Sequence, residues 1–169
     1  DVYKRQLMDI AVSMTRNSRG GPAKAGVVGS SLMGMISGTA VANVLTTGTI
    51  SIPLMRRGGY RPAVAGAVEA VASTGGQLMP PIMGAAAFLM ADIMEVPYLD
   101  ITKAALLPAL LFYIAVFASV HLEAVKTGLK PLESIDIPDV AQSLRNSGHV
   151  LLSIPVFIGC LLYTSPSPR

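Results

Sequence analysis

The chain has 169 residues, of which 14% are charged and 51% are hydrophobic, and its mean hydropathy is +0.56. Soluble globular domains carry about 25% charged residues, so the composition argues against such a domain and indicates a polytopic helical membrane protein. The formal net charge of +3 comes with no aromatic-rich basic face, so we expect no nucleic-acid partner.

No catalytic or metal-binding motif accompanies this composition. The single cysteine, Cys160, offers neither a disulfide framework nor a set of metal ligands. His121 and His149 are far apart in the sequence, and we expect both to be loop or interface residues. The sequence contains no phosphate-binding loop and no HExxH or GxSxG pattern. We therefore expect neither enzymatic activity nor a bound cofactor.

The first and last residues look foreign to the rest of the chain. Residues 1–6 and 161–169 resemble translated sequencing-adaptor read-through. We expect the biological segment to cover about 7–160, cut from a longer protein. Residues 7–19 are expected to end a preceding helix, because the glycines and proline of 18–22 break it.

Residues 22–55 predict a re-entrant helical hairpin. A cluster of small and polar residues, 36–43, interrupts a long apolar run, and neither arm reaches the roughly 20 residues that a spanning helix needs. Both outer ends are basic, and basic flanks prefer the cytoplasmic face. The cluster would then lie near mid-membrane, where transporters use non-helical backbone to build substrate and ion sites. The basic residues are Arg16, Arg19 and Lys24 before the hairpin and Arg56, Arg57 and Arg61 after it.

Residues 63–95 predict a discontinuous helix. As one helix this stretch would be about 50 Å long, too long for a bilayer core of about 30 Å. Two glycines and two prolines within 73–81 disrupt the helical hydrogen-bond ladder. We therefore expect a helix over 63–74, an unwound segment over 75–80 and a second helix over 81–95. Carbonyl groups freed at the end of the first helix can coordinate a cation.

Both interruptions leave a simpler interpretation open. Close helix packing alone would explain the glycines of the hairpin, including the pair Gly34 and Gly38, although it explains Asn43 and the adjacent threonines 46–47 less well. A proline kink, with its freed groups satisfied by neighbours, would explain the second interruption.

The remaining segments continue an alternating topology. An acidic turn over 92–100 suits the periplasmic side. Residues 101–125 predict the clearest spanning helix. The polar residues 126–148 predict a cytoplasmic linker, and 149–160 predict a truncated next transmembrane helix.

Glu69 is the one carboxylate deep within the apolar segments. Burying it in the bilayer as a charge costs about 2.5 kcal/mol or more, so we expect it to face protein rather than lipid. It lies about one and a half helical turns before the predicted break, so its side chain need not reach a site there. We favour a structural or gating role for Glu69 over direct ion binding.

Several motifs follow one another in order along about 20–160. They are Ser37-Gly38-Thr39-Ala40-Val41-Ala42-Asn43, Ile52-Pro53-Leu54-Met55, Ala65-Gly66-Ala67-Val68-Glu69-Ala70, Ser73-Thr74-Gly75-Gly76-Gln77 and Met79-Pro80-Pro81. The run resembles the large membrane subunit of tripartite ATP-independent periplasmic (TRAP) transporters. It is most similar to the branch in which the small and large membrane subunits are fused in one chain.

The resemblance implies one half of an elevator-type secondary transporter with inverted repeats, in a bacterial inner membrane. It implies sodium-coupled uptake of organic anions such as carboxylates, delivered by a periplasmic solute-binding protein, together with a small membrane subunit region. The alternative is a channel subunit or a structural membrane module, although a channel needs a filter or a charged ring that this sequence lacks.

The resemblance also assigns positions to an ion or substrate site. Hydroxyl and carbonyl oxygens are the hard donors that Na⁺ needs, so the hairpin tip and the broken helix would together close one sodium site. The residues that match the tip are Ser37, Gly38, Thr39 and Asn43. At the position of Asn43 the family often has an acidic or amide residue. The residues that match the unwound helix are Thr74, Gly75, Gly76, Pro80 and Pro81.

Overall fold

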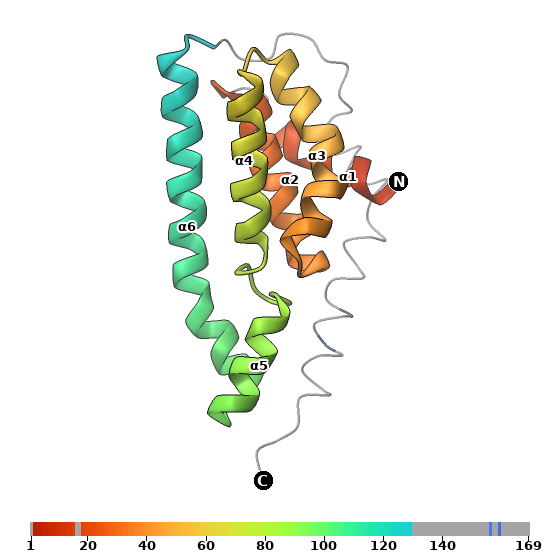
Figure 1. The fold of residues 1–169 in the computed structure, drawn as a ribbon, viewed down its shortest axis with the longest axis vertical. Helices are drawn as coiled ribbons and strands as arrows, with labels where there is room; N and C mark the ends of the chain where they lie inside the picture. Colours follow the sequence, from red (N-terminus) through yellow and green to blue (C-terminus); the bar gives the residue numbers. More distant parts are fainter. Residues whose placement is uncertain (1, 16–17, 130–155, 157–158, 160–169) are drawn as a thin grey trace.

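The computed structural model describes residues 2–15, 18–129, 156 and 159, and this part of the chain consists of helices and turns without strands (Figure 1). The prediction of an all-α fold is confirmed. The expected linker beyond residue 129, most of the truncated helix over 149–160 and the terminal segment 161–169 lie outside the described residues. The helices are α1 (Val2–Thr15), α2 (Gly21–Ser37), α3 (Ala40–Arg57), α4 (Pro62–Gly76), α5 (Ala85–Met94) and α6 (Tyr98–Lys126).

Helices α2 and α3 form a hairpin that packs against α4 (Figure 1). The chain reverses at Gly38 and Thr39, and Gly34 on α2 lies beside Asn43 on α3. Gly38 has a φ of 65°, a left-handed conformation that glycine adopts without steric cost, and its N–H donates to the Gly34 carbonyl 3.0 Å away. The predicted interruption over 36–43 was too wide, because α3 already begins at Ala40.

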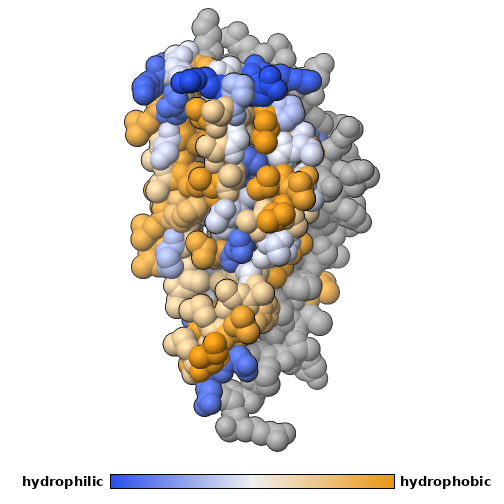
Figure 2. All heavy atoms as spheres, viewed as in Figure 1, coloured by the Kyte–Doolittle hydropathy of each residue, from blue (hydrophilic) through white to orange (hydrophobic). Residues whose placement is uncertain are grey.

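The open end of the hairpin gathers basic residues. Pro22 near the start of α2 packs beside Gly58, directly after α3, so the two helices run antiparallel. Nζ of Lys24 lies 3.3 Å from Nδ1 of His121, which joins this end of α2 to α6. Figure 2 shows a hydrophilic band at the top of the molecule, a largely hydrophobic side face and a smaller hydrophilic group at the bottom. Both ends of the hairpin therefore lie at one end of the bundle, as the basic flanks require.

The break between α4 and α5 covers residues 77–84 rather than the predicted 75–80. Gly75 and Gly76 are the last residues of α4 and are buried against other helices. The next helix does not begin at Pro81, because Met83 has a φ of 56°, which a right-handed helix cannot contain. The N–H of Gly84 donates to the carbonyl of Gln77 at 2.8 Å and closes the break into a compact loop.

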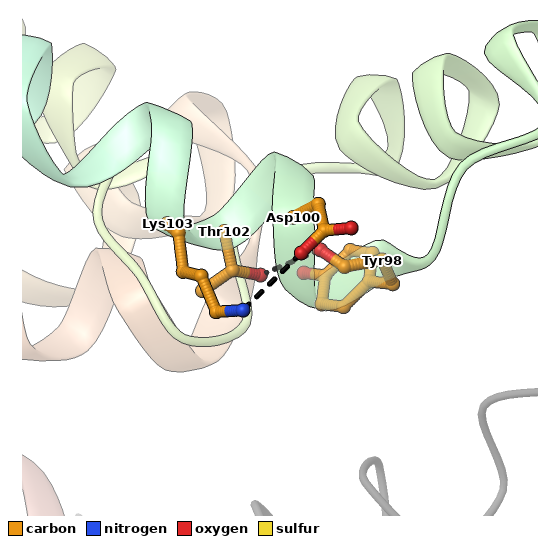
Figure 3. A network of polar contacts seen from close by, with 4 residues as sticks. All are labelled: Tyr98, Asp100, Thr102 and Lys103. Atoms are coloured by element: carbon orange, nitrogen blue, oxygen red, sulfur yellow. Dashed lines mark hydrogen bonds and ion pairs between the residues drawn. The ribbon is translucent and has the colours of Figure 1, made fainter.

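Helix α6 is the one helix among the described residues that is long and apolar enough to span a membrane, by length and composition. It begins at Tyr98, earlier than the predicted 101, and its first turn is held by a hydrogen bond from Thr102 Oγ1 to the Tyr98 carbonyl at 3.0 Å (Figure 3). The Tyr98 hydroxyl donates to the carbonyl groups of Pro81 and Ile82. The start of α6 therefore holds the break in place.

Candidate functional site

The hairpin tip and the break between α4 and α5 lie against each other. A Cβ atom on Gly38 would lie 3.1 Å from the carbonyl oxygen of Met83, and a Cβ atom on Gly84 would lie 3.1 Å from the carbonyl oxygen of Gly38. Glycine at both positions lets the two backbones approach with no side chain between them. The fold thus brings together the two regions to which the sequence assigned the site.

Close to the tip, α2 and α4 meet at two glycines. A Cβ atom on Gly34 would lie 2.6 Å from the Cα of Gly76, and the reverse distance is also 2.6 Å. Real Cβ atoms essentially never come this close to backbone, so a larger residue fits only if one helix moves. The side-chain nitrogen of Asn43 would lie 2.7 Å from the Cβ on Gly34 and 3.3 Å from that on Gly76. These three residues set the spacing between the hairpin and the end of α4.

Four helix ends come together in this region. They are the C-terminal ends of α2 at Ser37 and of α4 at Gly76, and the N-terminal ends of α3 at Ala40 and of α5 at Ala85. A helix carries a partial charge of about −0.5 at its C-terminal end and about +0.5 at its N-terminal end. Discontinuous helices in transporters use C-terminal carbonyls for cations and N-terminal N–H groups for anions. This arrangement has the chemistry to hold a cation beside an anionic group.

The hydroxyl groups predicted for the site are directed mainly at nearby backbone. Ser37 Oγ lies 3.4 Å from the carbonyl oxygen of Thr39 and 3.5 Å from that of Gly34. Thr39 is exposed and precedes α3 without a side-chain cap. Thr74 lies in α4, not in an unwound segment, and its exposed hydroxyl donates to the Ala70 carbonyl at 2.8 Å. Backbone groups, rather than these hydroxyls, therefore dominate the contact between tip and break.

The carbonyl groups at the end of α4 are not left unpaired, in contrast to the prediction. The carbonyls of Thr74, Gly75 and Gly76 accept hydrogen bonds of 3.2, 2.9 and 3.2 Å from the N–H groups of the next turn. The cause is that the chain tightens into successive turns after α4 instead of unwinding at once. Each carbonyl oxygen has two lone pairs, so one acceptor position remains on each. Pro80 and Pro81 are half-buried within the break.

Glu69 on α4 is fully buried at 0% exposure, so the prediction that it faces protein is confirmed. Its Oε1 accepts hydrogen bonds from Ser30 at 2.8 Å, from Ser73 at 3.0 Å and from Thr47. Its Oε2 accepts a hydrogen bond from Ser51. All four hydroxyl partners are buried, which is how a carboxylate is accommodated inside a protein.

The partners of Glu69 were not found from the sequence, although a signal for them exists. Asn43, Thr47 and Ser51 recur at every fourth position of α3, so they share one face of that helix. Glu69 and Ser73 share a face of α4 for the same reason. Two such polar stripes in apolar helices indicate that the two faces meet.

A hairpin whose tip touches the break of a discontinuous helix is typical of membrane transport proteins. The comparison with known families agrees with this class. The chain belongs to the family described as the DctM component of tripartite ATP-independent periplasmic transporters, which it matches over residues 3–168. The resemblance inferred from the ordered motifs is thus confirmed, and the family is one of integral membrane transport components rather than enzymes.

Individual relatives match with moderate identity. The chain is 28% identical over 155 residues to the C4-dicarboxylate TRAP transporter large permease protein DctM of Pseudomonas aeruginosa, covering 92% of this chain and 36% of that protein. It is 34% identical over 107 residues to protein y4mL of Sinorhizobium fredii, covering 63% of this chain and 25% of that protein. It is 27% identical over 158 residues to YgiK of Salmonella typhimurium, covering 94% of this chain and 36% of that protein. The chain thus spans between a quarter and just over a third of the length of these relatives.

Proposed function

We propose that this chain is the part of a TRAP permease in which the hairpin tip and the break after α4 bind the coupling ion, Na⁺, beside the substrate path. The complete protein takes up organic anions across the bacterial inner membrane, driven by sodium, and moves its substrate by an elevator-type motion. Its small membrane subunit region is fused to the large one.

The observation that carries this proposal is the backbone contact between Gly38 at the tip and residues 83–84 in the break. The neighbouring crossing of Gly34 and Gly76 brings the C-terminal ends of α2 and α4 to the same region, where their partial negative charges favour a cation. The carbonyl oxygens at these ends supply the uncharged oxygen donors that suit a weakly held coupling ion. A tightly held ion would not be released after transport.

Two observations indicate the class of substrate. The N-terminal end of α3 at Ala40 supplies a positive partial charge next to the cation region, which suits a carboxylate group. The P. aeruginosa relative is described as a C4-dicarboxylate transporter. We therefore infer that the cargo is an organic anion with at least one carboxylate, handed over by a periplasmic solute-binding protein.

The test is uptake by the complete permease in proteoliposomes with its solute-binding protein outside. A radiolabelled C4-dicarboxylate, loaded on the binding protein, is expected to accumulate above its external concentration when a sodium gradient is directed inward. The same gradient made with potassium should give no accumulation, because only a coupled ion can drive concentration of the substrate.

Two results would contradict the proposal. Equal accumulation with potassium and sodium would remove the sodium coupling. Sodium-independent equilibration, without accumulation, would favour the channel alternative over a transporter. Omitting the binding protein serves as the internal control, and it should abolish uptake at low substrate concentration.

A further inference from the structure

The carboxylate of Glu69 joins three helices through the hydroxyl groups of Ser30 on α2, Thr47 and Ser51 on α3, and Ser73 on α4 itself. We call these five residues the Glu69 latch. All of them are buried, with exposed fractions between 0% and 3%. Among the side chains described over residues 7–15 and 18–129, no basic group forms an ion pair with Glu69, and hydroxyl donors satisfy it.

The carboxylate is the part of the latch that links the hairpin to α4. Serine and threonine hydroxyls in a helix can bond to the carbonyl four residues earlier on their own helix, and Thr47 Oγ1 lies 2.8 Å from the Asn43 carbonyl oxygen in this way. Such bonds lie within one helix and do not connect two helices. The Glu69 carboxylate accepts hydrogen bonds from four hydroxyl groups, three at Oε1 and one at Oε2. Glu69 therefore connects hydroxyl groups of α2 and α3 to α4.

The geometry favours positioning over ion binding at Glu69. Ser30 Oγ lies 2.8 Å from Glu69 Oε1 and 3.0 Å from Thr47 Oγ1, and Ser73 Oγ lies 3.0 Å from Oε1. These are direct hydrogen-bond distances, as expected for hydroxyl donors that satisfy a carboxylate. The carboxylate oxygens are therefore already engaged by hydroxyl groups of the protein.

The latch lies close to the contacts that position the hairpin tip. Thr47 is one helical turn from Asn43, whose side-chain nitrogen donates to the Ser30 carbonyl at 2.8 Å. Ser73 is three residues before Gly76, where α4 meets α2. A shift of either arm at the latch is therefore carried along a rigid helix to the tip or to the end of α4.

We propose that Glu69 is a positioning residue, whose carboxylate holds both arms of the hairpin against α4 and so fixes the tip opposite the break. This role rests on the proposed function, in which that contact binds Na⁺. It requires hydrogen-bond acceptors at Glu69 rather than its negative charge.

The test compares Glu69→Gln and Glu69→Met in the complete permease carrying Thr39→Cys at the exposed tip. Glutamine keeps an acceptor oxygen, and its amide can donate to the Ser51 hydroxyl. We measure the maleimide labelling rate of Thr39→Cys in sodium-free buffer and the half-saturating sodium concentration for uptake. In the glutamine variant, both quantities are expected to stay within about twofold of the parent. Methionine keeps the length but not the hydrogen bonds, and both quantities should rise about tenfold, with less change in maximal uptake. Ser119→Ala, on an exposed position of α6, is the matched control and should change neither.

A second variant covers the case in which Glu69→Met does not reach the membrane. Thr47→Val combined with Ser51→Ala removes the links to α3 and leaves the carboxylate with Ser30 and Ser73, so faster labelling at the tip is again expected. Parent-like labelling and sodium dependence in whichever of the two variants is inserted would overturn the proposal. Because labelling in sodium-free buffer requires no transport, it tests the latch separately from sodium coupling.

Discussion

Gly76→Ala in the complete permease is expected to weaken the apparent affinity for sodium by about tenfold or more and to lower the stability of the protein. The added Cβ would lie 2.6 Å from the Cα of Gly34, so α4 must move away from the hairpin. Overpacking of this kind costs about 1–3 kcal/mol, which exceeds the gain of about 1 kcal/mol from alanine's higher helix propensity. The displaced end of α4 would no longer face the tip in the same geometry.

The measurements are the melting temperature in detergent and the sodium dependence of uptake. Gly66→Ala is the matched control, because Gly66 lies in the same helix and has no atom within 4 Å of an added Cβ. It should keep sodium affinity and hold or slightly raise the melting temperature. Gly34→Ala should reproduce the Gly76→Ala result from the other helix. Parent-like behaviour of both Gly34→Ala and Gly76→Ala would show that the close crossing is not needed.

Asn43→Leu is expected to lower stability by about 1–3 kcal/mol and to reduce sodium-driven uptake strongly. Asn43 is fully buried, and its amide donates to the Ser30 carbonyl at 2.8 Å while lying against the two crossing glycines. Leucine has a similar volume but removes the donor and places methyl groups against that carbonyl. The loss therefore combines a missing hydrogen bond with a displaced contact at the tip.

Thr46→Val provides the comparison for Asn43→Leu, because Thr46 lies on the same helix and its hydroxyl bonds to its own backbone. It should change the melting temperature and the uptake rate little. If Asn43→Leu matched Thr46→Val in both measurements, the buried amide would have no part in holding the tip.

The features that the sequence predicted well depend on chain length, charge and backbone chemistry. Arms too short to span, with basic residues at both ends, require the chain to reverse, and Gly38 supplies the left-handed residue for the turn. Glu69 had to face protein because lipid cannot satisfy a carboxylate, whatever the details of packing. None of these features depends on which helices are neighbours.

The features that were missed depend on which helix lies beside which. Gly75 and Gly76 were expected to unwind, but they remain helical because their missing side chains make room for Phe112 and Gly34. The hydroxyl partners of Glu69 come from three helices, and only the relative register of those helices shows that Ser30 and Ser51 reach the same carboxylate. Glycine and serine have weak local preferences, so tertiary contacts decide their roles.

Sodium-dependent protection from labelling tests whether the tip and the break form one sodium site. Thr39→Cys reports on the tip, Leu78→Cys on the break and Arg57→Cys on the basic end, and all three positions are exposed. In the purified complete permease, sodium is expected to slow maleimide labelling at Thr39→Cys and Leu78→Cys together, with one half-effective concentration, and to leave Arg57→Cys unchanged. Potassium should protect none of them. Equal labelling at the tip and the break with sodium and with potassium, in protein that transports, would show that they do not form one sodium site.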